Sequence, residues 1–106
     1  MSMSGSTRTI KQTLETLRVL CPTQYPVRVR RTKLPDGIFG DADYISKGKR
    51  HFKIRLCSKL TPEFLVWVLV HEWAHCMTWD LTHSRHDDHG AYFGIAYSEA
   101  YQAIYS

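Results

Sequence analysis

The chain has 106 residues, a length that suits one domain with a single hydrophobic core. Hydrophobic residues make up 43% and charged residues 23%, and the longest apolar run is too short to cross a bilayer, so no membrane partner is expected. The three cysteines include no C-x-x-C pair, which argues against a disulfide framework and against a cysteine zinc ribbon.

The net charge of +4 is unevenly distributed along the chain. Residues 1–59 contain thirteen of the fourteen Lys and Arg residues but only four of the ten acids. A basic half of this kind favours a polyanion such as DNA as partner, although a solvated sheet face explains it equally well. The candidate nucleic-acid contacts are Arg28, Arg30, Arg31, Lys47, Lys49, Arg50, Lys53 and Arg55.

The N-terminal part predicts a flexible start followed by a helix. Residues 1–6 are rich in Ser and Gly and are expected to be flexible, and residues 7–106 are expected to form one domain. An apolar stripe at helical spacing ends before Pro22 and consists of Ile10, Leu14, Leu17 and Cys21.

Three strands are predicted next. Val27 and Val29 alternate with arginines, residues 38–45 read as a second strand with a candidate bulge at Gly40, and residues 51–57 read as a third. Turn signals lie at residues 34–37 and 46–49. The short turns predict a three-stranded antiparallel meander, and with the flanking helices an α+β fold.

Two helices complete the prediction. Thr61, Pro62 and Glu63 form a typical helix start, and the helix is expected to run to about Thr78. Residues 64–70 are apolar on every side, so this helix is expected to be buried. After a polar loop, a last helix is expected from His89 or Gly90 to Ile104.

The segment His71-Glu72-Trp73-Ala74-His75 matches the pattern H-E-x-x-H on this buried helix. Residues four apart share a helix face, so His71 and His75 can bind one Zn²⁺ ion. Glu72 is positioned to act as general base toward water. Burying two imidazoles and a carboxylate is costly unless they are paired or bound to metal, which favours a zinc site over chance.

Four residues compete as the third ligand: His83, His86, His89 and Glu99. Thr78 and Leu81 stand where a metzincin needs Gly and His, which excludes that spacing. Glu99, the gluzincin-like alternative, lies about 80° from the inward stripe of the last helix. His89 lies on that stripe and precedes Gly90, so His89 is favoured.

The H-E-x-x-H segment and the later His89-Gly90-Ala91-Tyr92-Phe93 together resemble the signature of SprT-like zinc metalloproteases. Gly40, Tyr44 and the strand at residues 54–60 extend the resemblance to roughly residues 38–95. The resemblance implies a small zincin-type domain with zinc ligands His71, His75 and His89 and catalytic Glu72. It also implies action on DNA-associated proteins.

The sequence therefore predicts a cytoplasmic or nucleoid-associated zinc endopeptidase that cleaves a protein or peptide substrate. The substrate is expected along an exposed strand edge, with the third strand as candidate. Candidates for oxyanion or substrate contact are Tyr92, Tyr97, His83, His86 and Arg85. The alternative is a zinc-stabilised DNA- or protein-binding module without turnover, and the oligomeric state stays open.

Overall fold

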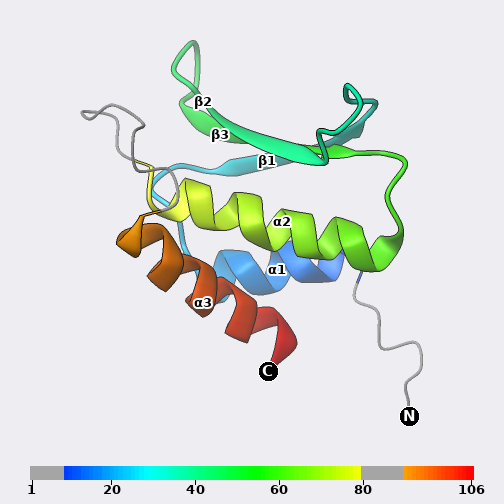
Figure 1. The fold of residues 1–106 in the computed structure, drawn as a ribbon. Helices are drawn as coiled ribbons and strands as arrows, with labels where there is room; N and C mark the ends of the chain where they lie inside the picture. The colour runs from blue at the N-terminus through cyan, green and yellow to red at the C-terminus, as the bar shows by residue number, and fades with distance from the viewer. Residues whose placement is uncertain (1–8, 80–89) are drawn as a thin grey trace.

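The computed structural model describes residues 9–79 and 90–106, so the predicted flexible start at residues 1–6 lies outside the described residues. The elements are, in order, α1 (Ile10–Leu20), β1 (Val27–Thr32), β2 (Gly40–Ile45), β3 (His51–Cys57), α2 (Pro62–Met77) and α3 (Ala91–Tyr105). The predicted α+β fold is confirmed. Figure 1 shows α2 directly beneath the sheet, with α1 and α3 on the other side of α2.

Local signals explain where the helices begin. Thr9 and Gln12 form a reciprocal capping box at the start of α1, with N···O distances of 3.0 and 3.1 Å. The Thr61 hydroxyl accepts a hydrogen bond from the Phe64 N–H, and Pro62 occupies the first turn of α2. The predicted start of α2 is therefore confirmed.

The predicted antiparallel meander is wrong, because the sheet is mixed. Its strand order is β1-β3-β2, with β3 parallel to β1 and antiparallel to β2. β3 takes the centre because its Phe52, Ile54 and Leu56 are fully buried, whereas β1 has one buried residue, Val27, and β2 has none. After β1 the chain crosses to the far edge of the sheet and forms β2. A short turn then leads into β3, which lies between β1 and β2.

Gly40 allows close packing of β2 against α2 and does not form a bulge. The pairing of β2 with β3 is continuous from Gly40 opposite Leu56 to Ile45 opposite His51, so the bulge prediction is wrong. A Cβ atom at residue 40 would lie 2.6 Å from Cγ1 of Val68 and 3.0 Å from the Arg55 carbonyl oxygen. Glycine therefore lets the edge strand approach α2 at van der Waals distance.

The core lies on both sides of α2, against the sheet on one side and against α1 and α3 on the other. Trp73 of α2 is 1% exposed, and its indole N–H donates to the Cys21 carbonyl at 2.8 Å, which ties α2 to the end of α1. All three cysteines are free thiols, and Cys21 and Cys76 are buried. No helix within the described residues has the length and apolarity that crossing a membrane requires.

Candidate metal and catalytic site

One narrow stripe of α2 reaches solvent. Between residues 64 and 76 every side chain is buried except those of Phe64, Trp67, His71 and His75. Their spacing of three, four and four residues places them on one helix face, which we call the α2 stripe. The helix therefore exposes two aromatic rings followed by two imidazoles.

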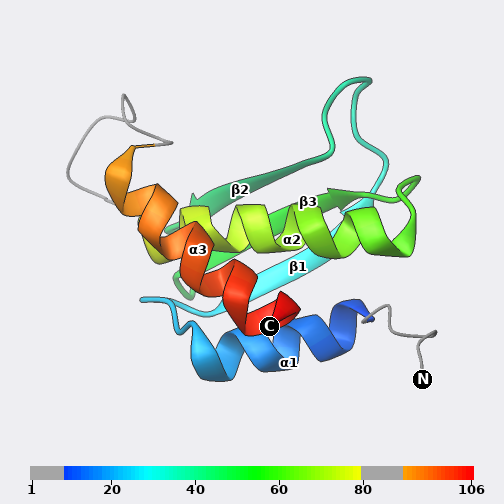
Figure 2. The same cartoon turned by 60° about the horizontal axis from the view of Figure 1, so that its bottom comes forward.

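α3 forms a wall beside the histidines. The ring centroids of His71 and His75 lie 5.0 Å apart. The Phe93 ring lies 4.4 Å from His75 and 5.3 Å from His71, and Tyr97 lies 5.8 Å from His71. Figure 2 shows α3 crossing α2 at the end that carries these residues. The first turns of α3 are thus fixed next to both imidazoles.

Glu72, which lies between the two histidines in the sequence, is buried, with 8% of its surface exposed. Burial raises the pKa of its carboxyl from 4.5 to about 7, and the negative charge of Asp41 adds to this effect. No ion pair to Glu72 is formed among residues 9–79 and 90–106. Glu72 can therefore gain and lose a proton near neutral pH, as a general acid/base must.

The charge of Asp41 is the second cause, after burial, of the raised pKa of Glu72, and the sequence analysis missed Asp41. It lies on β2 opposite Arg55, and the Arg55 Nε donates to Asp41 Oδ1 at 2.9 Å. The same charge that pairs with Arg55 disfavours ionisation of Glu72. Its position could be foreseen only by knowing that β2 is the edge strand beside α2.

The described donor set fits two of the ligands that a zinc site needs. Both imidazoles lie on the α2 stripe, and imidazole nitrogen is a common zinc ligand. His83, Arg85, His86 and the favoured third ligand His89 lie outside the described residues, and the remainder contains no cluster of three ligand side chains. His89 therefore stays a prediction.

Glu99, the alternative ligand, is directed elsewhere. Its side chain is exposed on α3, and its charge is the second cause, after burial, that raises the pKa of the Cys21 thiol at the end of α1. Phe93 and Tyr97, which contact the imidazoles, lie on a different face of α3. This placement favours a ligand other than Glu99.

Of the two described tyrosine candidates, only Tyr97 adjoins the histidines. Tyr92 is 83% exposed and projects from α3 into solvent. Burial raises the pKa of Tyr97, with a smaller opposing effect from a hydrogen bond to the Trp67 side chain. The Tyr97 hydroxyl is therefore protonated at neutral pH and can donate a hydrogen bond.

The Cys76 thiol is unreactive, although it lies on the same helix as the histidines. Burial raises the pKa of its thiol to about 12, and the charge of Glu72 contributes. A thiol in this state is a poor nucleophile and a poor ligand. Cys76 therefore behaves as a small core residue.

The basic residues are only partly brought together. Four of them, Arg28, Arg30, Lys53 and Arg55, share the sheet face turned away from the helices, which we call the open face (Figure 1). Arg31 lies on the other face, and Lys47, Lys49 and Arg50 lie in the β2–β3 turn, where Arg50 contacts the Tyr25 hydroxyl at 3.4 Å. Asp41 and Asp43 stand opposite Arg55 and Lys53, so the open face is less positive than the sequence suggests.

The strand predicted to bind substrate is also different. β3 is paired on both sides, so it has no free edge and the earlier expectation is wrong. The edge strands are β1 and β2, and of these two β2 packs against α2, where Gly40 faces the buried Val68. Main-chain groups on the outer edge of β2 are thus the ones near the candidate site.

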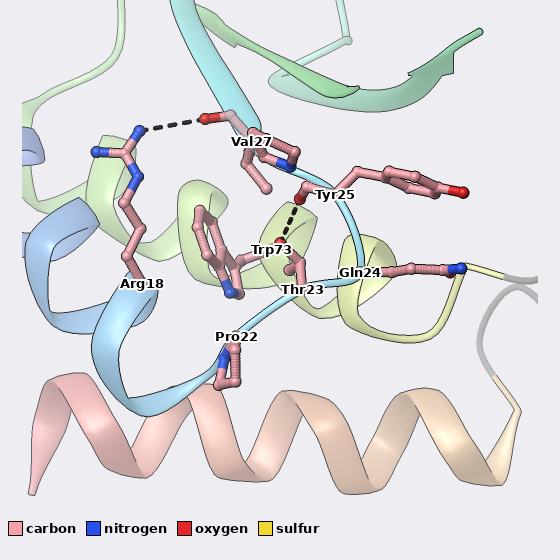
Figure 3. A pocket seen from close by; sticks show the side chains of 8 residues that line it. Arg18, Pro22, Thr23, Gln24, Tyr25, Val27 and Trp73 are labelled. Atoms are coloured by element: carbon pink, nitrogen blue, oxygen red, sulfur yellow. Dashed lines mark hydrogen bonds between the residues drawn. The ribbon is translucent and has the colours of Figure 1, made fainter. Parts of the chain in front are cut away.

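A pocket of about 400 Å³ lies away from the histidines. Figure 3 shows it between the α1–β1 connection and Trp73, with Arg18 donating to the Val27 carbonyl and Thr23 to that of Tyr25. It contains no residue of the α2 stripe.

Comparison of the chain with protein-family profiles, with curated proteins and with solved structures finds no match.

Proposed function

We propose that the protein is a zinc-dependent endopeptidase of the SprT-like type. The observation that supports this most is the α2 stripe. A largely buried helix presents two half-buried imidazoles on one face, and between them in the sequence it holds a buried carboxyl with a pKa of about 7. A purely structural metal site has no use for such a carboxyl.

In this proposal His71, His75 and the predicted His89 hold one Zn²⁺ ion. A zinc ion bound there supplies Lewis acidity, polarising the scissile carbonyl and lowering the pKa of water toward 7. Phe93 packs against both imidazoles and restricts their orientation.

Glu72 moves the protons. It takes a proton from the attacking water and returns it to the leaving amine, a role that its place next to the first ligand, His71, allows. Asp41 helps to keep the pKa of Glu72 high. Tyr97, next to His71, is the described residue best placed to donate a hydrogen bond to the developing oxyanion.

The outer edge of β2 is the proposed binding strand for substrate. An extended peptide paired with this edge lies beside the α2 stripe and is held by main-chain hydrogen bonds. Such binding is independent of side chains, so specificity must come from other contacts.

Association with DNA is proposed for the open face. Arg28 and Arg30 of β1 and Lys53 of β3 share it with Arg55, which is paired with Asp41. Arg28 and Arg30 form no ion pair with any residue of 9–79 or 90–106, so they are the strongest candidates for phosphate contacts. This arrangement would bring the enzyme to proteins that are bound to DNA.

The main experiment compares zinc-loaded parent protein with Glu72→Gln on a basic, DNA-associated protein, with and without DNA. The parent is expected to cleave the substrate, and Glu72→Gln is expected to keep its zinc and lose at least about 100-fold in rate. Equal cleavage by the variant would contradict the mechanism. No cleavage by zinc-loaded parent would favour the binding-module alternative.

A further inference from the structure

We propose that the aromatic end of the α2 stripe binds a bulky apolar side chain of the protein substrate, close to the bond that is cleaved. The inference rests on the proposed peptidase function and adds a specificity determinant to it. The residues concerned are Phe39, Phe64 and Trp67, which we call the aromatic patch.

The patch is one continuous surface. The Phe39 and Phe64 rings lie 5.1 Å apart, and those of Phe64 and Trp67 lie 5.8 Å apart. Trp67 lies four residues before His71 on the α2 stripe, one helical turn away, and Tyr97 of α3 contacts His71. The aromatic patch therefore adjoins the candidate catalytic site on the same face of α2.

Two of these rings, Phe39 and Trp67, remain exposed although burial would be favourable. Phe39 is 50% exposed and Trp67 is 45% exposed, while Val66 and Val68 on either side of Trp67 are buried. The backbone around Phe39 is anchored, since its carbonyl accepts a hydrogen bond from the Cys57 N–H at 2.8 Å. An anchored, exposed aromatic cluster beside a reactive site is typical of a binding surface.

Helix geometry gives the position of the favoured side chain. Trp67 lies one helical turn before His71, about 6 Å along the axis, and Phe64 lies about 10 Å before it. An extended peptide advances about 3.3 Å per residue. A chain along the stripe would therefore place a residue two or three positions from the scissile bond against the patch.

An extended substrate is favoured over a second copy of this chain because the patch shares its helix face with the histidines. Phe39 contacts Phe64 of the stripe, and Gly40, the first residue of β2, directly follows Phe39 in the sequence. Main-chain pairing with β2 and side-chain contact with the patch can thus occur in one bound peptide.

The test uses zinc-loaded protein and pairs of fluorogenic peptides that differ only by Phe or Ala at positions within three residues of the cleaved bond. For the parent, kcat/KM is expected to be about 10-fold or more higher for Phe at one such position. Trp67→Ala should bring this ratio close to one, and Trp67→Phe should retain most of it. Phe39→Ser is a second variant outside the helix, and Val19→Ala, exposed on α1, is the control that keeps the full ratio.

The two proposals fail in different ways. If the parent cleaves peptides but Trp67→Ala and Phe39→Ser keep the full Phe preference, the patch is not a specificity site and the peptidase function stands. If no peptide is cleaved but labelled Phe peptides bind in a Trp67-dependent manner, the patch stands and the peptidase function fails. If Trp67→Ala instead converts an oligomer to a monomer in light scattering, the patch is a self-association surface and the inference is overturned.

Discussion

The α2 stripe and the open face of the sheet differ in the number of their polar groups and in how deeply those groups are buried. The open face contains several charges, but Asp41 and Asp43 stand opposite Arg55 and Lys53 and offset them. The α2 stripe contains few ionisable groups, yet these lie on an otherwise buried helix next to a carboxyl whose pKa is about 7. A small number of polar groups placed where burial is the rule is more informative about chemistry than a large number placed where solvation is cheap.

The strongest test of this contrast is loss of metal. His71→Ala and His75→Ala are each expected to abolish stoichiometric zinc binding and to lower peptidase activity by at least about 100-fold. His51→Ala removes a histidine at the start of β3 on the open face and is expected to keep both. Zinc content after dialysis and activity of the same samples check this. Full zinc content in His75→Ala would contradict the assignment.

A second test concerns the loss of folding stability that the buried Glu72 carboxyl causes at high pH. The folded-state pKa of Glu72, about 7, exceeds its ordinary value of 4.5. Below pH 4.5 the carboxyl is protonated in both the folded and the unfolded state and costs no stability. The free energy of unfolding then falls as the pH rises through 7, because the buried carboxyl must ionise. In protein treated with chelator, Glu72→Gln should therefore raise the free energy of unfolding by about 3 kcal/mol at pH 8 and by less than about 1 kcal/mol at pH 5.

Urea denaturation at the two pH values measures this difference. Glu15→Gln, exposed on α1, is the matched control and should change stability by less than about 0.5 kcal/mol at either pH. A Glu72→Gln effect that is the same at pH 5 and pH 8 would show that the carboxyl is not held near neutrality.

The third test asks whether Gly40 sets the distance between β2 and α2. Gly40→Ala is expected to destabilise the protein by about 2 kcal/mol, because the new Cβ meets Val68 and a backbone oxygen. Gly94→Ala, in α3 with no atom within 4 Å of its Cβ position, should stabilise by up to about 1 kcal/mol. Thermal denaturation compares the two, and the same sign for both would refute the packing role.

The smallest effects are expected on the open face. Each phosphate contact contributes a slope of about −0.9 to the dependence of log affinity on log salt, so Arg28→Ala with Arg30→Ala should make the slope shallower by about 2. Asp43→Asn should strengthen DNA binding, since it removes a carboxylate opposite Lys53. Fluorescence anisotropy at several salt concentrations measures both, and an unchanged slope in the double variant would remove this face as the DNA site.

Local signals predicted much of the fold correctly. Helix α1 follows its apolar stripe, Thr61 and Pro62 start α2, and the turn before β2 forms with the Ile38 N–H donating to the Pro35 carbonyl. These features depend on neighbours in sequence, so a single sequence contains them. The strand order was missed because it depends on which strand buries the most apolar surface.

The candidate site divides in the same way. The sequence by itself determined that His71 and His75 share a face of a buried helix with Glu72 between them, since helical periodicity fixes which side chains are neighbours. Only the tertiary structure decided that Asp41 contributes to the high pKa of Glu72, that Tyr97 and not Tyr92 adjoins His71, and that β2 is the edge beside the site. Those relations join residues far apart in the chain, and they follow from packing, which no local pattern specifies.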